Sequence, residues 1–364
     1  MARRVVHFVG GGTGGTVGPG IAIAERLRER DPHLDIRFTC SDRPVDRRLL
    51  DPGDWTAIPT PARSPSRRPI EAWRFLRGWR ATRRIFGHAL AESDGPRRVV
   101  ALGGFVCPPA VLEASRRRVP VDLVNLDAVV GRANRFVARR ADRVFSAVPA
   151  DLRLDQPPVG VPLRRASLPA GSPADARTAL GLDPDRRTLL VTGASQGARS
   201  IDEFIADFAR TAADGLAGWQ VSHLAGGGIE RLEAAYRDAA VPATVRPFLE
   251  GMGLAWTAAD LAISRGGASS VAEISESRTP AIILPYPWHA DRHQARNAEA
   301  LAELGLVEIL DDPSTGDVAS RRLDEALRRL LSDPAELDRR RDAVPRSGID
   351  AADRLAALVL ERLA

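Results

Sequence analysis

The sequence predicts an α/β protein made of two consecutive Rossmann-like domains, each with a parallel sheet. The chain has 364 residues, which is more than a single hydrophobic core usually serves. Short apolar segments alternate with helical patterns along most of its length, as is typical of βαβ units. Several of these segments end in glycines or other small residues just before a helix, where open α/β sheets bind their ligands.

The first domain is expected to span residues 1–160. Its first strand covers residues 4–9, and a glycine-rich turn at 10–15 separates this strand from a helix at 19–28. The other strands expected in this domain are the apolar segments at residues 35–40, 98–102, 121–124 and 143–147. Because helical patterns lie between several of these strands, the sheet is expected to be parallel.

A proline-rich stretch at residues 149–173 breaks helical patterns and marks the linker between the domains. The second domain is expected to span residues 161–345, with a glycine-bearing turn at 193–197 after its first strand. Its expected strands are the apolar segments at residues 188–192, 220–224, 244–246, 261–264, 281–284 and 307–310. The last segment, residues 346–364, contains an amphipathic helix that could pack on either domain, including back on the first.

The composition excludes several classes of protein. Hydrophobic residues make up 44% of the chain and charged residues 27%, as in globular rather than disordered proteins. No stretch approaches the roughly 20 apolar residues that span a bilayer, and the first apolar run is too short for a secretory signal. Cys40 and Cys107 are the only cysteines, so neither a disulfide framework nor a cysteine-based zinc site is expected. These features predict a cytoplasmic protein.

Residues 10–16 form the first motif, a glycine-rich turn between a strand and a helix. Glycines let the backbone approach a ligand, and N–H groups at the start of a helix favour an anion. A dinucleotide-binding turn would need an acidic residue closing the second strand, and the nearest one, Asp42, fits poorly. A dehydrogenase is therefore disfavoured, although the motif alone is also compatible with a plain tight turn.

Two motifs of the second domain place polar side chains at helix starts. Residues 193–199 put Ser195 among small residues after a strand, which suits a phosphate. Residues 285–297 combine a proline-rigid strand exit with a helix start dense in hydrogen-bonding side chains, which suits the hydroxyls of a sugar. His289 and His293 are four residues apart and could share a helix face. No carboxylate or third histidine lies at ligand spacing, so no metal site is expected.

The motif at residues 264–273 is the most informative one in the second domain. The hydroxyls of Ser269 and Ser270, with nearby backbone N–H groups, could hold a diphosphate at a helix start. Glu273, one turn further, could accept both hydrogen bonds from a ribose diol. A capping box with Glu273 as its third helical residue is the structural alternative, but it leaves the preceding Arg-Gly-Gly unexplained.

Together these motifs resemble the MurG-like UDP-N-acetylglucosamine transferases of glycosyltransferase family 28, which have the GT-B fold. The resemblance covers nearly the whole chain. The segments that carry it are residues 11–20, 103–105, 160–164, 193–199, 247–249, 265–274 and 291–297. The segments of the second domain are specific to the family, whereas glycine loops alone are not.

The resemblance implies two Rossmann-like domains whose parallel sheets face each other across a cleft that binds the donor. It implies an inverting, metal-independent hexosyltransferase that moves N-acetylglucosamine from UDP-GlcNAc to a lipid-linked acceptor. That acceptor would be of the undecaprenyl-diphosphate muramyl-pentapeptide type, in peptidoglycan precursor synthesis. No cofactor is expected, because the UDP-sugar is a substrate. Such an enzyme would be a peripheral protein at the inner face of the cell membrane.

The resemblance also assigns the donor site residue by residue. The residues assigned to the diphosphate are Arg164, Ser195, Ala268, Ser269, Ser270 and Val271. Leu249 would meet the uracil, Glu273 the ribose and Gln294 the sugar hydroxyls. The facing wall of the first domain would be formed by Thr13, Gly14 and Gly15.

The sequence departs from the family at the two candidate catalytic positions. Thr16 stands where the family has a histidine, and residues 124–127 read Val-Asn-Leu-Asp where the family has His-Glu-Gln-Asn. A histidine can act as a general base near neutral pH, and threonine cannot. We therefore hypothesise that Asp127 deprotonates the acceptor hydroxyl. The alternatives are a different lipid or small-molecule acceptor, a GT-B sugar-nucleotide epimerase and a non-catalytic UDP-sugar-binding protein.

The basic charge of the chain is concentrated in residues 63–90. The chain has 52 basic residues, all of them arginine, against 47 acidic ones, and this segment holds eight of those arginines and one acid. Helical spacing places aromatic residues beside the arginines, as in helices that bind anionic membrane surfaces. The membrane-facing residues expected are Trp73, Phe75, Leu76, Trp79, Arg80 and Arg84. An ordinary surface helix is the alternative, and a single short patch disfavours nucleic acid as a partner.

Overall fold

A computed structural model describes residues 3–12, 15–51, 55–92, 95–193, 197–345, 348 and 350–363. The chain folds into two compact units, each with its own sheet. The first unit contains Met1–Arg165 together with Ile349–Ala364, and the second contains Ala166–Gly348. The chain thus leaves the first unit at Arg165, whereas the boundary expected from the sequence was residue 160.

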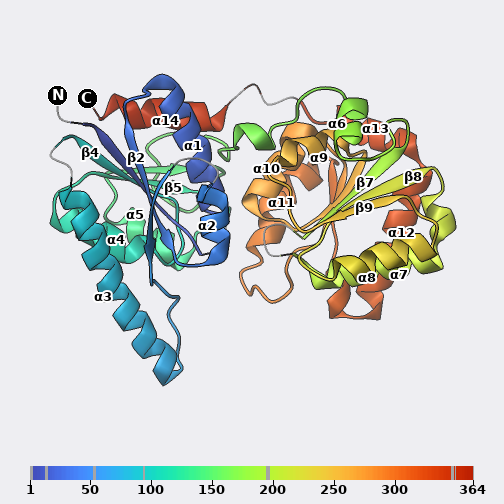
Figure 1. Ribbon diagram of the computed structural model, residues 1–364, viewed down its shortest axis with the longest axis horizontal. Coiled ribbons are helices and arrows are strands. Elements are labelled where there is room, and N and C mark those ends of the chain that lie inside the picture. The colour runs from blue at the N-terminus through green and yellow to red at the C-terminus, as the bar shows by residue number, and fades with distance from the viewer. Residues whose placement is uncertain are drawn as a thin grey trace. The chain divides into compact units, whose positions relative to one another are not determined.

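The first unit is a six-stranded parallel sheet in the order β3-β2-β1-β4-β5-β6, with helices on both faces (Figure 1). This order is that of the Rossmann sheet. Its strands are β1 Val5–Val9, β2 Asp35–Ser41, β3 Thr56–Thr60, β4 Arg97–Ala101, β5 Val121–Asn125 and β6 Arg143–Ser146. Its helices are α1 Val17–Arg30, α2 Pro44–Leu50, α3 Pro69–Ala91, α4 Cys107–Arg116, α5 Arg132–Ala138 and α14 Ala351–Glu361.

The strand β3 was not anticipated from the sequence. It lies at the edge of the sheet, and only Thr60, the last of its five residues, is buried. Pro59 interrupts the strand pattern, and an edge strand tolerates proline because one row of its backbone N–H groups has no partner strand. The position of β3 at the edge therefore explains why its sequence lacks the signal of a buried strand.

The second unit repeats the architecture with the strand order β12-β11-β10-β7-β8-β9 (Figure 1). Its strands are β7 Arg187–Thr192, β8 Trp219–Leu224, β9 Ala243–Arg246, β10 Leu261–Ser264, β11 Ala281–Ile283 and β12 Val307–Ile309. Its α-helices are α6 Pro173–Ala179, α7 Arg199–Thr211, α8 Ile229–Asp238, α9 Met252–Ala258, α10 Ala268–Ser277, α11 His293–Glu303, α12 Asp317–Ser332 and α13 Pro334–Asp342. Short 3-10 helices are η2 Arg165–Ser167, η4 Ala213–Leu216 and η5 Pro313–Thr315.

The central strands of the second sheet are buried on both faces, so neighbouring residues of one strand belong to different cores. In β7, Leu189 and Val191 join the cluster formed with α7, α8 and α12. Leu190, which points to the opposite face, joins the cluster formed with α9, α10 and α11. This double burial explains the continuous apolar pattern of the strand, and it leaves the loops at the carboxyl edge for polar residues.

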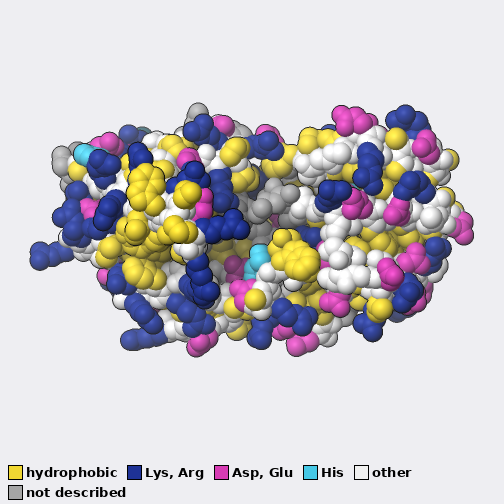
Figure 2. Space-filling model, turned by 90° about the horizontal axis from the view of Figure 1, so that it is seen from below, with side chains coloured by type: hydrophobic (Ala, Val, Ile, Leu, Met, Phe, Trp, Pro, Cys, Tyr) yellow, Lys and Arg dark blue, Asp and Glu magenta, His cyan; other side chains and the backbone are white. Residues whose placement is uncertain are grey.

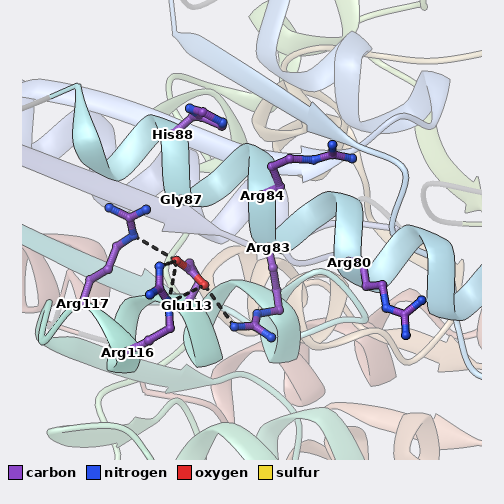
Figure 3. Close-up of a pocket in the computed structure, with 8 residues that line it drawn as sticks. All are labelled: Arg80, Arg83, Arg84, Gly87, His88, Glu113, Arg116 and Arg117. Atoms are coloured by element: carbon purple, nitrogen blue, oxygen red, sulfur yellow. Dashed lines mark hydrogen bonds and ion pairs between the residues drawn. The ribbon is translucent and has the colours of Figure 1, made fainter.

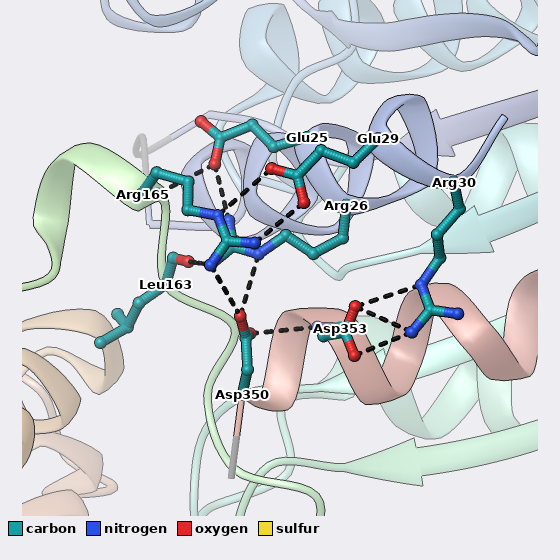
Figure 4. A network of polar contacts seen from close by, with 8 residues as sticks. All are labelled: Glu25, Arg26, Glu29, Arg30, Leu163, Arg165, Asp350 and Asp353. Atoms are coloured by element: carbon teal, nitrogen blue, oxygen red, sulfur yellow. Dashed lines mark hydrogen bonds and ion pairs between the residues drawn. The ribbon is translucent and has the colours of Figure 1, made fainter. Parts of the chain in front are cut away.

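The last helix, α14, packs against α1 of the first unit (Figures 1 and 4). Arg26 of α1 is fully buried, and its guanidinium donates to Asp350 Oδ2 at 3.1 Å and to the Leu163 carbonyl at 3.2 Å. Arg30 makes a two-pronged ion pair with Asp353 in the first turn of α14. Helix α1 thus contacts both the segment where the chain leaves the first unit, at Leu163, and the segment where it returns, at Asp350.

Candidate functional site

The loop after β1 in the first unit requires glycine at two positions. Gly11 and Gly12 have φ angles of +134° and +114°, a region that other residues rarely adopt. A Cβ atom at Gly12 would overlap the ring of Phe105, and one at Gly11 would overlap the carboxylate of Asp46. The loop is therefore a close-packed turn, as its glycine run predicted.

Four of the predicted site residues belong to this loop. Thr13 and Gly14 lie outside the described residues, and Gly15 is exposed. Thr16 occupies the N-cap position of α1, but its side chain does not cap the helix. Its Oγ1 is buried and has no hydrogen-bond partner in the described part of the chain. The catalytic role predicted for Thr16 stays a prediction.

Asp46 of α2 supports the same loop and was missed by the sequence reasoning. It is fully buried, and its Oδ2 accepts hydrogen bonds from the Gly12 N–H at 2.9 Å, the Ser41 N–H at 3.1 Å and the Ser41 hydroxyl at 2.5 Å. Asp42, the acid considered for a dinucleotide site, instead pairs with Arg63 at 2.7 Å. Asp46 could have been found in the sequence as an acidic residue in the first turn of a short helix after β2.

Asp127 lies in the loop after β5, half-buried at the carboxyl edge of the sheet. Asn125, the last residue of β5, is fully buried beneath this loop. Its Nδ2 donates to the Asp127 carbonyl at 2.8 Å and to Ser146 Oγ at 3.0 Å, and its Oδ1 accepts from Asn134 Nδ2 at 2.9 Å. A network of buried amides therefore fixes the backbone that carries the predicted general base.

The loop after β4 joins these two regions. A Cβ atom at Gly104 would come within 2.5 Å of the Gly11 carbonyl, and one at Gly103 would come within 2.8 Å of Asn134 Oδ1. The loop after β4 therefore packs directly on the loop after β1 and on Asn134 of α5, whose side chain donates to Asn125 below the Asp127 loop. Cys107 lies below this edge, and burial raises the pKa of its thiol to about 12, so it stays protonated.

In the second unit, the starts of α10 and α11 lie side by side at the carboxyl edge of the sheet. A Cβ atom at Gly266 would overlap the Gln294 carbonyl, and Asn297 Nδ2 donates to the Gly266 carbonyl at 3.1 Å. Gly267 is the N-cap of α10, and no described side chain caps this helix, so the capping box considered from the sequence does not form. The first turn of α10 holds the predicted diphosphate residues Ala268, Ser269, Ser270 and Val271.

The residues predicted to bind the nucleoside and the sugar surround these helix starts. Glu273 is buried in the second turn of α10, and its Oε2 accepts the indole N–H of Trp256 at 2.9 Å. Gln294 lies in the first turn of α11, and its Oε1 accepts the Tyr286 N–H at 2.8 Å. Leu249 is half-buried after β9 and packs against the cores below. Each side chain is thus already oriented by the protein.

Arg265, the residue directly after β10, connects the loops at this edge. Its buried guanidinium donates to the Leu284 carbonyl at 2.8 Å, to Asp312 Oδ2 at 2.5 Å and to Ser200 Oγ at 3.1 Å. Burial alone would raise the pKa of Asp312, but hydrogen bonds from Ser314 and the charge of Arg265 lower it below its ordinary value. Arg265 therefore positions the loops after β10, β11 and β12 and is not itself presented to a ligand.

Two further residues were assigned to the diphosphate, Ser195 and Arg164. Ser195 is outside the described residues. Arg164 is half-buried at the end of the first unit, next to Leu163, rather than in the second unit where the sequence had placed it. The histidine pair of the fourth motif stacks with ring centroids 4.7 Å apart, and His293 contacts Asp291 at 2.8 Å. Within the described ranges, no group of three or more His, Cys, Asp or Glu residues is arranged to hold a metal ion.

The basic helix α3 divides the predicted membrane residues into two sets. Its N-terminal half projects beyond the rest of the first unit (Figure 1). Trp73 and Leu76 are 59% and 53% exposed there, next to Ile70, which is 68% exposed. Phe75 and Trp79 lie on another side of the helix and are half-buried. The ring of Trp79 contacts the ring of Phe136, with centroids 6.3 Å apart. The face of this unit seen in Figure 2 carries hydrophobic side chains bordered by arginines.

Arg80 and Arg84 lie further along α3 and line an open cavity of about 490 Å³ between α3 and α4 (Figure 3). The cavity is basic: Arg83, Arg116 and Arg117 line it as well, and all three contact its single carboxylate, Glu113. Hydrogen bonds from these arginines lower the pKa of Glu113 to about 2. None of the helices in the described ranges combines the length and the apolar character needed to cross a bilayer.

Two Rossmann-like units, each with a six-stranded parallel sheet, are the architecture of GT-B proteins, and comparison with solved structures confirms this fold. The MurG of Acinetobacter baumannii superimposes with a TM-score of 0.72 at 24% identity, over 98% of this chain and 99% of that one. The calicheamicin glycosyltransferase CalG4 gives a TM-score of 0.65 at 18% identity, over 100% and 99%. A UDP-N-acetylglucosamine 2-epimerase gives 0.64 at 13% identity, over 99% and 96%. At these identities the likeness concerns the fold alone.

The family is shown by the sequence. The N-terminal domain model of glycosyltransferase family 28 matches residues 6–146, and the C-terminal domain model matches residues 188–355. The chain belongs to glycosyltransferase family 28. Among its relatives is a protein of Mycobacterium leprae that is 36% identical over 98% of this chain and 88% of its own length. Another, from Mycolicibacterium smegmatis, is 37% identical over 98% and 93%.

Both relatives are named UDP-N-acetylglucosamine–N-acetylmuramyl-(pentapeptide) pyrophosphoryl-undecaprenol N-acetylglucosamine transferase. A third relative with this name, from Streptomyces coelicolor, is 33% identical over 99% of this chain and 98% of its own length. The resemblance that the sequence motifs predicted is therefore confirmed at the level of the family and the fold.

Proposed function

We propose that this protein transfers N-acetylglucosamine from UDP-GlcNAc to N-acetylmuramyl-(pentapeptide) pyrophosphoryl-undecaprenol, the acceptor in the names of its relatives. The observation that carries the proposal is the 36–37% identity to two such relatives over 98% of the chain, with both family domains present. The geometry of the second unit supports the same donor, because two adjacent helix starts offer the charge and the polar side chains that a sugar nucleotide requires.

The donor would bind along the starts of α10 and α11. Backbone N–H groups and the positive end of the α10 dipole would neutralise the diphosphate, with the hydroxyls of Ser269 and Ser270 beside them. Glu273, oriented by Trp256, would accept hydrogen bonds from the ribose. Gln294, oriented by the Tyr286 N–H, would contact the sugar. Preoriented groups of this kind lower the cost of binding because they need not reorganise.

The acceptor chemistry would fall to the first unit. The Asp127 carboxylate would take the proton of the acceptor hydroxyl while that oxygen forms a bond to the anomeric carbon of the donor. The bond from this carbon to the diphosphate would break on the opposite face, so that UDP departs with the electron pair and the configuration is inverted. The helix-start N–H groups would stabilise the charge that develops on UDP, and the buried Asn125 would keep the Asp127 loop in place.

A lipid-linked acceptor requires contact with a membrane, and α3 supplies a surface for it. Its exposed tip carries Ile70, Trp73 and Leu76, and further arginines follow on the same helix around the basic cavity. Aromatic and aliphatic side chains enter the headgroup region of a bilayer, and arginines attract anionic lipids. The protein would accordingly act as a peripheral enzyme at the inner face of the cell membrane.

The test is a transfer assay with radiolabelled UDP-GlcNAc and lipid-linked muramyl-pentapeptide, with polyprenyl and diacylglycerol acceptors in parallel. We expect label in the lipid product and release of UDP. Conversion of UDP-GlcNAc without any acceptor would instead identify an epimerase, the class represented among the solved structures that share the fold. Binding of UDP in a calorimeter with transfer to no acceptor would identify a non-catalytic protein. A different preferred acceptor would correct the acceptor while keeping the reaction.

A further inference from the structure

The strand order of the second sheet changes direction at one point. From β7 the chain continues to β8 and β9 on one side of β7, and it then builds β10, β11 and β12 on the other side. Open α/β sheets bind their ligands outside the carboxyl ends of the strands at such a switch point, which lies here between the adjacent strands β7 and β10. The helices that follow these two strands, α7 and α10, therefore begin on either side of the switch point.

Helices α7 and α10 cover opposite faces of the sheet. Helix α7 packs with α8 and α12 in one core, and α10 packs with α9 and α11 in the other. Packing within one core fixes each helix against its own neighbours, but it does not set the spacing between the two helix starts. A ligand that contacts both starts therefore depends on a connection across the edge of the sheet.

A cluster of buried polar side chains makes this connection. Ser200 lies in the first turn of α7, Arg265 lies between β10 and α10, and Asp312 follows β12. The guanidinium of Arg265 donates to Asp312 Oδ2 at 2.5 Å and to Ser200 Oγ at 3.1 Å. The Ser200 hydroxyl donates to the same Oδ2 at 2.9 Å. The three side chains thus form a closed triangle of hydrogen bonds that joins α7 to the segment before α10.

Asp312 accepts hydrogen bonds at both carboxylate oxygens. Oδ1 accepts the Ser314 N–H at 2.8 Å and the Ser314 hydroxyl at 2.5 Å, while Oδ2 accepts from Arg265 and Ser200. An amide carries a donor in place of one oxygen, and neither the Arg265 guanidinium nor the Ser314 N–H can become an acceptor. Asparagine at position 312 would therefore leave one of these two donors facing another donor.

The charges of this cluster compensate each other away from water. Asp312 is 1% exposed and Arg265 is 6% exposed. Removal of the charge from one partner of a buried ion pair leaves the other uncompensated, so the remaining side chain and its loop tend to move. Replacement of Asp312 is therefore expected to release Arg265 from its position between β10 and α10.

The cluster is continuous with the residues assigned to the donor. Arg265 is followed directly by Gly266, whose backbone lies against the Gln294 carbonyl at the start of α11. A shift of Arg265 would move this contact together with the first turn of α10, which holds the residues predicted to bind the diphosphate. On the other side of the switch point, Ser200 directly follows the motif at residues 193–199, which the sequence predicts to suit a phosphate.

We propose that Asp312 is a positioning residue for the sugar nucleotide, which holds the starts of α7 and α10 at a fixed spacing through Ser200 and Arg265. The inference rests on the proposed function and deepens it, because it names a residue that shapes the donor site through its neighbours. A diphosphate gains most from N–H groups that are already oriented, since these need not reorganise when the ligand binds.

The test measures donor binding separately from stability. In Asp312→Asn we expect the Kd for UDP in a calorimeter and the KM for UDP-GlcNAc to rise about tenfold, with the acceptor KM within about twofold. Ser200→Ala removes only the link to α7 and should raise the Kd for UDP and the donor KM about threefold. Asp311→Asn changes the exposed carboxylate next in the chain and is the matched control, expected to keep wild-type values.

Thermal unfolding followed by circular dichroism shows which variants are folded. A lower Tm for Asp312→Asn with a UDP Kd within twofold of wild type would overturn the inference, because Asp312 would then serve stability alone. If Asp312→Asn does not fold, Ser200→Ala decides, and an unchanged Kd for UDP would overturn the inference. Weaker UDP binding in both variants, with a wild type that binds UDP and transfers to no acceptor, would support the inference and refute the proposed function alone.

Discussion

The carboxyl edges of the two sheets are held together by different means. In the second unit, two helix starts meet through backbone groups, with the Gly266 backbone against the Gln294 carbonyl. In the first unit, buried side chains carry the loops: Asp46 lies under the glycine turn, and Asn125 lies under the Asp127 loop. An edge built from backbone leaves a recognisable pattern of small residues in the sequence. An edge built from buried side chains can change its residues while keeping its shape, and this edge holds Thr16 and residues 124–127, where the sequence differs from the motifs that the resemblance predicts.

The largest effect is expected at Asp127, the residue of the first unit that is proposed as the general base. Replacement Asp127→Asn is expected to lower kcat about 1000-fold, since loss of a general base typically costs two to four orders of magnitude. The loop should keep its fold, because the buried Asn125 donates to the Asp127 carbonyl, which the substitution leaves unchanged. The measurement is steady-state transfer, with Asp151→Asn, an exposed acid of the same unit, as control. Turnover near the wild-type rate would move the base to another group.

The first unit is also expected to be the more acid-sensitive one. His7 in β1 is fully buried, and neither of its ring nitrogens has a hydrogen-bond partner among the described residues. Burial, followed by the charge of Arg37, lowers the pKa of His7 from 6.5 to about 4. The unfolded chain therefore takes up a proton at a higher pH than the folded chain, and folding stability falls as the pH drops from 6.5 to 4.

Between pH 6.5 and pH 4, protonation of His7 is expected to lower the free energy of unfolding by about 3 kcal/mol. Denaturant unfolding of the wild type and of His7→Leu, followed as a function of pH, measures it. We expect the wild type to lose unfolding free energy relative to His7→Leu as the pH falls from 6.5 to 4. A difference independent of pH between 6.5 and 4 would contradict the assignment of the pKa.

The backbone contact of the second unit gives a smaller effect. A Cβ atom in Gly266→Ala would push on the Gln294 carbonyl and separate the starts of α10 and α11. We expect the KM for UDP-GlcNAc to rise about tenfold, with a smaller change in acceptor KM, since the disturbed edge is the donor edge. Gly215→Ala, where the new Cβ would make an ordinary contact with Phe208 at 3.6 Å, is the control. An unchanged donor KM would show that the two helix starts need not touch.

Of the exposed tryptophans in the two units, only the one on α3 is expected to contribute to membrane binding. Trp73 of the first unit and Trp288 of the second are 59% and 72% exposed. If α3 is the membrane surface, Trp73→Ala should weaken binding to vesicles containing phosphatidylglycerol about fivefold, by removing an aromatic side chain from the headgroup region. Trp288→Ala should leave it unchanged. Equal losses in a flotation assay would mean that the second unit also meets the bilayer.

The regions that could be predicted from the sequence are those whose signal is local. The continuous apolar pattern at 188–192 marked β7, and the small residues after Ser264 marked the start of α10. The strand β3 stayed hidden because an edge strand need not be apolar. The buried residues that hold the loops of the candidate site were not predicted either. Asp46 accepts a hydrogen bond from Gly12, 34 positions away, and Asn134 donates one to Asn125, nine positions away. The spacing of residues in a sequence does not show which buried polar side chain will hydrogen-bond to which loop.

The packing of α14 on α1 has a consequence for the order in which the protein is made. The first unit is assembled from both ends of the chain, since it contains Met1–Arg165 and Ile349–Ala364. Ala352, Leu355 and Val359 of α14 are buried there, so the core of the first unit is complete only after the last residues have been synthesised. The second unit is continuous in sequence and can close earlier. Completion of the first unit therefore depends on a segment that lies beyond the whole of the second unit in the chain.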